Sequence, residues 1–97
     1  MKQMLCAAIG TRRLLRLAYG GGLRIVEPYC YGTTQEGREI VSVFQTSGFS
    51  RSGAASGWKT LHVDEVTELS VSPERFLQNQ PDYNPQDPGV AVVWCQV

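Results

Sequence analysis

The segment that most constrains the fold of this chain is residues 12–31, in which two β-prone runs flank three consecutive glycines. Before the glycines, Leu15, Leu17 and Tyr19 alternate with other residues, so they share one face of an extended strand. The glycines at 20–22 adopt, at little cost, the positive φ angles that a tight hairpin turn requires. Residues 12–31 therefore predict a β-hairpin.

The rest of the chain has short apolar runs separated by turn residues, which is typical of antiparallel β proteins. The predicted strands are residues 13–19, 23–26, 38–45, 58–63, 66–71 and 90–97. Pro28 follows the second strand, so we expect that strand to end, to bulge or to run along an edge at this point. The glycine- and serine-rich segment 46–57 is expected to be a loop.

Two short helices are predicted, one near each end of the chain. Residues 3–10 place apolar side chains at helical spacing, and Gly10 is expected to end this helix. It is too short to be stable alone and must pack on the sheet. The second helix is expected to begin at Ser72, a capping residue followed by proline, with Phe76 and Leu77 as its anchors.

Together these elements predict a mainly β fold. We expect a small five-stranded antiparallel barrel with short N- and C-terminal helices and an extra C-terminal strand. The 97 residues suffice for one domain at most. Residues 1–80 would form the barrel domain, and residues 81–97 an extended tail that ends in the extra strand. Because an unpaired apolar strand promotes aggregation, residues 90–97 should pair with a sheet edge of this chain or of a partner.

The cysteines suggest neither disulfides nor zinc. There are three, Cys6, Cys30 and Cys95, with no Cys-x-x-Cys spacing and a single histidine in the chain. Cys30 and Cys95 lie in apolar runs, where free cysteines behave as small buried hydrophobic residues. Neither a signal peptide nor a run of about 20 apolar residues is present, so we expect a soluble protein in a reducing cytoplasm.

Enzyme motifs are incomplete in this sequence. Residues 53–60 resemble a phosphate-binding loop, but a tryptophan precedes the lysine and a strand follows. Residues 48–52 resemble a nucleophile elbow but lack its closing glycine. His62 and Asp64 could form a triad with a serine of residues 50–56 only on paper, because their spacing matches no known pattern. We therefore expect no enzyme, no cofactor and no metal site.

Positive charge is concentrated at the start of the chain. Residues 25–97 carry all nine acidic residues, whereas residues 1–24 carry five basic residues and no acid. The five are Lys2, Arg12, Arg13, Arg16 and Arg24. This asymmetry indicates an anion-binding face, or else two segments that neutralise each other in the fold.

The remaining candidate for function is a binding site for an anion. Arg24, Arg51 and Lys59 could hold a carboxylate or a phosphate. Aromatic side chains that could stack on a base or a sugar are Tyr19, Phe49 and Trp58. The alternative is that the aromatic residues belong to the core and that the basic residues are solvated or paired with acids. The acids considered for this pairing are Glu27, Glu36 and Glu39.

Several segments share their order with a known family. They are the helix with Ile9, then residues 13–19, 24–28, Gly37 with 41–45, 57–66, and the segment around Phe76. In this order, which spans about residues 5–77, the chain resembles the WYL domain, a bacterial module with an Sm-like barrel. It is similar to a short standalone member without the winged-helix domain of longer members. Residues 39–41 stand at the namesake Trp-Tyr-Leu position, and His62 stands where the family has a ligand-facing arginine.

The resemblance implies a non-catalytic, ligand-sensing module linked to transcriptional regulation. Its ligand would be an anionic small molecule such as a nucleotide, or an oligonucleotide, and a DNA-binding protein could be its partner. The predicted ligand-binding residues are Tyr19, Arg24, Gln45, Arg51, Trp58, Lys59 and His62. Two alternatives stay open: direct RNA or DNA binding by the basic hairpin, and protein assembly, including a homodimer, through the strand at 90–97.

Overall fold

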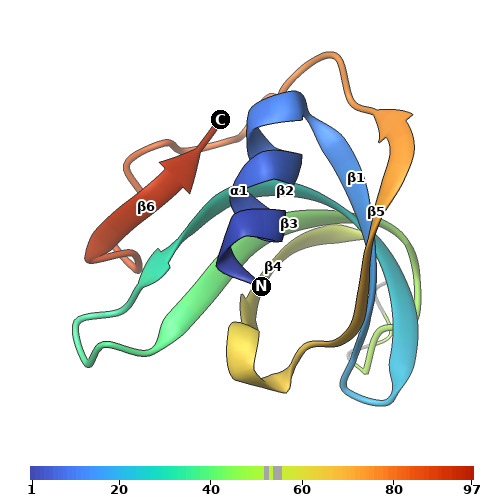
Figure 1. Cartoon of the computed structure of the whole chain (residues 1–97), viewed down its shortest axis with the longest axis horizontal. Helices are drawn as coiled ribbons and strands as arrows, with labels where there is room; N and C mark the ends of the chain where they lie inside the picture. The colour runs from blue at the N-terminus through green and yellow to red at the C-terminus, as the bar shows by residue number, and fades with distance from the viewer. Residues whose placement is uncertain (52, 54–55) are drawn as a thin grey trace.

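One antiparallel sheet of six strands, crossed by one α-helix, makes up the described part of the chain (Figure 1). The structure is a computed structural model, and it describes residues 1–51, 53 and 56–97. The elements in chain order are α1 (Lys2–Thr11), β1 (Arg13–Tyr19), β2 (Gly22–Thr33), β3 (Glu39–Gly48), β4 (Gly57–His62), the 3₁₀ turn η1 (Val63–Glu65), β5 (Thr67–Arg75) and β6 (Val92–Gln96). The predicted mainly β, antiparallel fold is confirmed. None of the described helices combines the length and the hydropathy that spanning a bilayer requires.

The predicted loop at 46–57 is shorter than expected, because β3 continues to Gly48. Ser52, Ala54 and Ala55 lie outside the described residues. The segment 53–60, which resembles a phosphate-binding loop, and the segment 48–52, which resembles a nucleophile elbow, are therefore described only in part. Ser52, one of the serines considered for a triad, is not described.

Strand β2 is the centre of the sheet. The strand order is β4-β3-β2-β1-β5, and β6 also pairs with β2. β1 pairs with the first part of β2 and β6 with its last part, so these two strands share one edge of β2. Figure 1 shows α1 in front of β2, with β6 on one side and β1 on the other. The C-terminal strand was expected to pair with a sheet edge of this chain or of a partner. It pairs with β2 of its own sheet.

The predicted hairpin forms, but its turn has two residues instead of three, because Gly22 already belongs to β2. Tyr19 of β1 pairs with Gly22 of β2, and Gly20 and Gly21 between them have φ angles of 64° and 101°. Positive φ at both central residues gives the turn a twist that matches the flanking strands. Pro28 lies inside β2, at a shift of register against β3, so the proline is accommodated by a β-bulge.

The core lies between α1 and the inner face of the sheet. Its buried residues are Leu5, Ala8, Ile9, Leu15, Leu17, Val26, Tyr31, Val41, Val43, Leu61, Val63 and Val66. Leu15 and Leu17 are completely inaccessible to solvent, whereas Arg16 between them is exposed. Burial of each such leucine contributes roughly 2 kcal/mol.

Helix α1 continues through Gly10 to Thr11, one residue further than predicted. Arg12 then adopts the left-handed conformation, with φ 56° and ψ 43°, and its N–H donates to the carbonyl oxygens at the end of the helix. The chain must reverse here because β1 begins at the next residue. The Arg12 guanidinium lies 5.4 Å from the centre of the Phe76 ring, which helps to hold this conformation.

The closed barrel is not confirmed. Strands β4 and β5 end the strand order and do not pair with each other in the described residues. The sheet is nevertheless strongly curled. At the end of β1, the Tyr19 hydroxyl accepts a hydrogen bond of 3.0 Å from the backbone N–H of His62 on β4.

The predicted helix at Ser72 is wrong, because the chain continues as β5 up to Arg75. The Ser72 hydroxyl accepts a hydrogen bond from the N–H of Glu74, a local contact that also starts helices. Pairing with β1 and burial of Phe76 against the Tyr29 ring, 5.2 Å between centroids, outweigh this local preference. Leu77, predicted as an anchor, is exposed.

The absence of disulfides was also predicted wrongly, because Cys6 of α1 and Cys95 of β6 are bonded to each other. The bond joins residues 89 positions apart and fastens β6 to α1. Cys30 is free and buried, as predicted, and burial raises the pKa of its thiol. Since disulfides persist mainly in oxidising compartments, the predicted cytoplasmic location is not confirmed.

Residues 76–91, here called the connector, join β5 to β6 and are attached to the sheet by a buried network. The Tyr29 hydroxyl donates to the Glu27 carboxylate (2.9 Å) and accepts from the backbone N–H of Gln80 (2.9 Å). The Gln80 side-chain amide donates to the same Glu27 oxygen (3.2 Å). These hydrogen bonds attach the connector to β2 at Gln80.

Burial of Tyr29 gives the fold an alkaline limit. Burial, together with the Glu27 carboxylate, raises the pKa of Tyr29 to about 12 from an ordinary value of 10.0. The folded state thus favours the neutral phenol. Its stabilising effect is complete below pH 10 and is lost as the pH rises to about 12. Urea unfolding between these pH values should show a falling free energy of unfolding, and Tyr29→Phe should make the fall less steep. Equal slopes for the two proteins would contradict this prediction.

Candidate anion-binding site

Arg24 is a buried cation on the inner face of β2. It pairs with Leu17 of β1, so both side chains lie on the same face of the sheet. Because Leu17 belongs to the core, the Arg24 side chain is directed inward, and only 5% of the residue is exposed. The register of the glycine hairpin therefore determines this placement.

Neutral groups hold the Arg24 guanidinium. Its Nε donates to the carbonyl oxygen of Tyr19 (3.1 Å), and its Nη1 donates to Oε1 of Gln45 on β3 (3.3 Å). The Gln45 amide in turn donates to the carbonyl oxygen of Phe49 (2.9 Å). The guanidinium carbon also lies 5.2 Å from the Tyr19 ring centre and 5.6 Å from that of Phe49. These contacts fix the orientation of the guanidinium without neutralising its charge.

The Arg51 side chain also approaches the hairpin turn, at Gly20. A Cβ atom added to Gly20 would lie 3.1 Å from Nη2 of Arg24 and 3.1 Å from Cδ of Arg51. Both arginine side chains therefore lie against Gly20, which also has a positive φ angle. A side chain at this position would displace at least one of them, so glycine provides both the turn and the space.

Lys59 of β4 lies next to this pair through the residue that precedes Arg51. Its ammonium group donates to the hydroxyl of Ser50 at 3.3 Å. Lys59 pairs with Val43, a core residue, and so shares the inner face of the sheet with Arg24. Three of the predicted cations, from β2, the loop and β4, thus gather at one end of the curled sheet.

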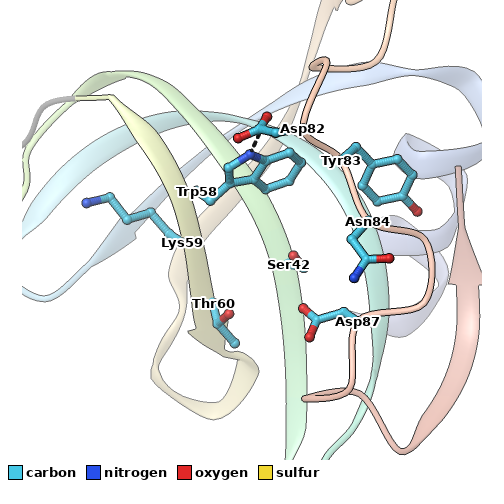
Figure 2. Close-up of a pocket in the computed structure, with 8 residues that line it drawn as sticks. All are labelled: Ser42, Trp58, Lys59, Thr60, Asp82, Tyr83, Asn84 and Asp87. Atoms are coloured by element: carbon cyan, nitrogen blue, oxygen red, sulfur yellow. Dashed lines mark hydrogen bonds between the residues drawn. The ribbon is translucent and has the colours of Figure 1, made fainter.

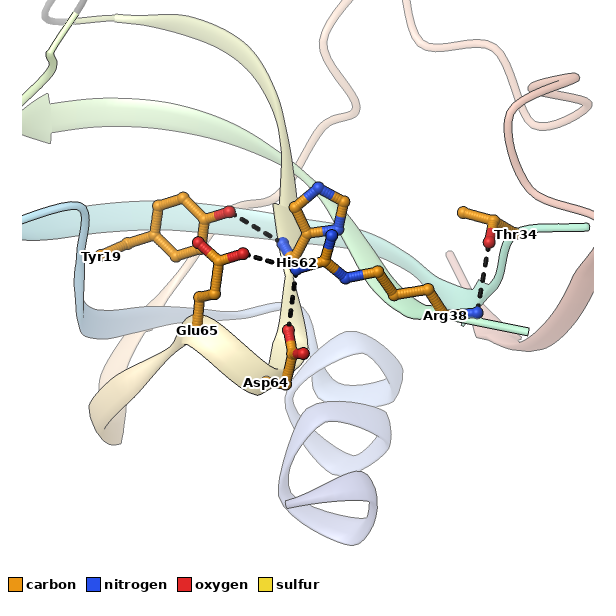
Figure 3. A network of polar contacts seen from close by, with 6 residues as sticks. All are labelled: Tyr19, Thr34, Arg38, His62, Asp64 and Glu65. Atoms are coloured by element: carbon orange, nitrogen blue, oxygen red, sulfur yellow. Dashed lines mark hydrogen bonds and ion pairs between the residues drawn. The ribbon is translucent and has the colours of Figure 1, made fainter. Parts of the chain in front are cut away.

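No acid balances Arg24 or Arg51 among the residues that the structure describes. The ion pairs found there belong to Arg38, which contacts Asp64 at 3.3 Å and also pairs with Glu65 (Figure 3). The acids considered as alternative partners are engaged elsewhere or exposed. Glu27 binds Tyr29, Glu39 binds Tyr31, and Glu36 is exposed. A buried cation without a counter-charge is costly, and a bound anion would offset this cost.

Trp58 does not join the cluster. Neighbouring residues of a strand point to opposite faces, so Trp58 lies on the outer face of β4 while Lys59 lies on the inner one. Its indole Nε1 donates to Oδ1 of Asp82 (2.9 Å), and its ring stacks on Tyr83 with 6.0 Å between centroids (Figure 2). The tryptophan thus belongs to a second hollow, between the sheet and the connector.

His62 contacts the cluster through its backbone. Its backbone N–H binds the Tyr19 hydroxyl, whereas its ring Nδ1 is buried without a hydrogen-bond partner in the described part of the chain. Asp64 lies on η1 and pairs with Arg38, as Figure 3 shows. His62 and Asp64 therefore do not form the hydrogen-bonded pair that a catalytic triad requires.

The predicted site is thus divided by the fold. Tyr19, Arg24, Gln45 and Arg51 come together, Lys59 lies beside them, and Trp58 and His62 make other contacts. The outer hollow is built by residues that the sequence analysis did not select, namely Ser42, Thr60, Asp82, Tyr83, Asn84 and Asp87. Trp58 and Lys59 are neighbours in a strand, so their side chains point to opposite faces. This pattern in the sequence was the signal that the two residues belong to different sites. Within the described residues, no group of three or more histidine, cysteine or acidic side chains is placed to hold a metal ion.

Comparisons of the chain with protein-family models, with curated proteins and with solved structures found no match. Its function is therefore argued from the geometry of its own residues.

Proposed function

We propose that this chain is a non-catalytic module that binds an anionic ligand between Arg24 and Arg51. The ligand class is a nucleotide or a short oligonucleotide. The module would act in transcriptional regulation, in the manner of a WYL-like domain with an Sm-like, barrel-shaped sheet, through a DNA-binding partner protein.

The observation that carries the proposal is the approach of two arginine side chains at Gly20 with no acid beside them. Arg24 is buried and forms no ion pair among the described residues, and a buried cation without a counter-charge lowers stability unless an anion is present. Arg24 is held rigidly by its contacts to Tyr19 and Gln45. A fixed guanidinium is suited to a carboxylate or a phosphate, which it can bind through two parallel hydrogen bonds.

The aromatic residues support a ligand with a base. Phe49 is 40% exposed and lies across Gly22, where an added Cβ would come within 2.4 Å of it. Tyr19 lies beside the same guanidinium. Stacking on an aromatic side chain contributes about 1–3 kcal/mol per base. A phosphate on the arginines and a base on the Phe49 ring would use both features.

Thermal unfolding with added anions tests the proposal. Inorganic phosphate, adenosine monophosphate and an eight-residue oligothymidylate should each raise the melting temperature, because they bind the native state only. Arg51→Gln removes one exposed cation, and we expect it to weaken binding by about tenfold, the value of one charge-assisted hydrogen bond. The matched control is Arg75→Gln, which removes an exposed arginine at the end of β5.

The anions distinguish the ligand classes. Stabilisation by the oligonucleotide alone, with a steep dependence on salt, would favour direct nucleic-acid binding. Equal loss of stabilisation in Arg51→Gln and Arg75→Gln would show non-specific attraction to positive charge. No shift with any of the three anions would overturn the proposal.

A further inference from the structure

A second candidate site lies on the opposite, outer face of the sheet, beneath the connector. Two adjoining hollows of about 290 and 320 Å³ are found here. Residues that line both are Ser42, Tyr83, Asn84 and Asp87. Figure 2 shows the side chains of Asn84 and Asp87 extending from the connector toward Ser42 and Thr60 on the sheet. We call this space the connector cleft.

The charge of the connector cleft is negative. Asp82 and Asp87 both line it, and no arginine does so. Lys59 belongs to its lining, but the ammonium group of Lys59 donates to Ser50, and Figure 2 shows this side chain leading away from Asp87. The carboxylates therefore face the cleft without a cation directed at them.

The polar groups of the cleft are held in place by the connector itself. Oδ1 of Asp87 accepts from the N–H of Gly89 (2.8 Å), and Oδ1 of Asn84 accepts from the N–H of Gln86 (3.0 Å). Such local contacts fix the side chains and leave the second oxygen of Asp87 for another partner. The Tyr83 hydroxyl is buried and has no hydrogen-bond partner in the described part of the chain.

The walls of the cleft are aromatic. Trp58 and Tyr83 stack with their ring planes 21° apart, and Asp82 fixes the indole through its Nε1. Carboxylates beside aromatic rings favour a ligand that carries positive charge on an apolar stem, because cations are attracted to ring faces and to acids alike. A cavity of this size admits a short chain of that kind.

We propose that the connector cleft binds an alkylammonium cation, with Asp87 as its principal carboxylate and the Trp58–Tyr83 pair along its apolar stem. The source is either a free aliphatic diamine or the lysine side chain of a peptide. The proposal is independent of the anion site, since the two sites lie on opposite faces of the sheet and share none of their principal residues.

The test uses Trp58 fluorescence. The chain has two tryptophans, so Trp94→Phe leaves Trp58 as the sole reporter. Titration with 1,4-diaminobutane and with N-acetyl-lysine amide distinguishes the two sources, and 1,4-butanediol is the neutral control of similar shape. We expect a saturable change with at least one amine, which weakens as salt is added, and none with the diol.

Variants locate the cation. Asp87→Asn keeps the oxygen that binds Gly89 and should weaken amine binding by about tenfold, whereas Glu36→Gln, at an exposed turn, should not change it. Asp82→Asn, which keeps an oxygen for the indole, should weaken binding as well, and circular dichroism shows whether each variant is folded. Absence of a saturable signal with both amines, equal binding of the diol, or equal effects of Asp87→Asn and Glu36→Gln would each overturn the proposal.

Discussion

Replacing Cys6 and Cys95 together by serine should lower the free energy of unfolding by roughly 4 kcal/mol. The disulfide closes a loop over 89 positions, so its loss gives the unfolded chain much more conformational freedom. The loss of the bond also frees β6 from α1. The short ladder between β6 and residues 30–33 of β2, with the flanking hydrogen bond from Val97 to Tyr29, then holds β6. Urea unfolding measures the change, and dithiothreitol should destabilise the natural chain by a similar amount.

Two controls make this prediction specific to the bond. Dithiothreitol should leave the stability of the double serine variant unchanged. Under denaturing, non-reducing conditions, the natural chain should show one free thiol, that of Cys30. Three free thiols, or equal stability with and without dithiothreitol, would contradict the disulfide. All three cysteines would then be free, as the sequence analysis predicted.

Gly32→Ala should be the most damaging single substitution at the junction of β2 and β6. A Cβ atom at Gly32 would lie 1.9 Å from the backbone oxygen of Val92 and 2.9 Å from a methyl group of Val90. The backbone cannot move aside as a side chain can, so β6 must separate from β2. We expect a loss of roughly 2–3 kcal/mol in the free energy of unfolding, the upper part of the usual range for overpacking, because the clash is with backbone.

The disulfide provides the control for Gly32→Ala. Without the bond, β6 can detach, so the same substitution should cost less in a chain that also carries serines at positions 6 and 95. The comparison is a double-mutant cycle measured by urea unfolding. Additive losses would mean that the strand is not held jointly by the bond and the ladder. Gly10→Ala, where an added Cβ meets nothing within 4 Å and φ is not positive, is the control for a glycine-to-alanine change without a clash.

The local parts of the fold could be predicted from the sequence. The glycine hairpin follows from strand alternation and from residues that tolerate positive φ, and both are properties of adjacent residues. The helix at Ser72 was predicted from the same kind of signal and is wrong. There, pairing with β1 and burial of Phe76 depend on residues more than 40 positions away, and no local pattern reports them.

The candidate site was predictable to a similar extent. Arg24 was selected from the sequence, but its inward direction depends on the two-residue turn that places it opposite Leu17, and the sequence predicted a turn of three glycines. Alternation would also have separated Trp58 from Lys59, which the sequence analysis placed in one site. The approach of Arg51 to Gly20 depends on the path of a loop, and the bond of Cys6 to Cys95 depends on how α1 packs beside β6, so neither could be derived from spacing.

Arginine side-chain NMR is the most direct test of the central claim, that Arg24 and Arg51 form one anion site. The Nε–Hε signals of the arginines are followed while adenosine monophosphate is added. We predict saturable shifts for Arg24 and Arg51 with a common dissociation constant, while the signal of Arg75 stays in place. Shifts of similar size at all arginines, or no shift at Arg24 and Arg51, would contradict the account.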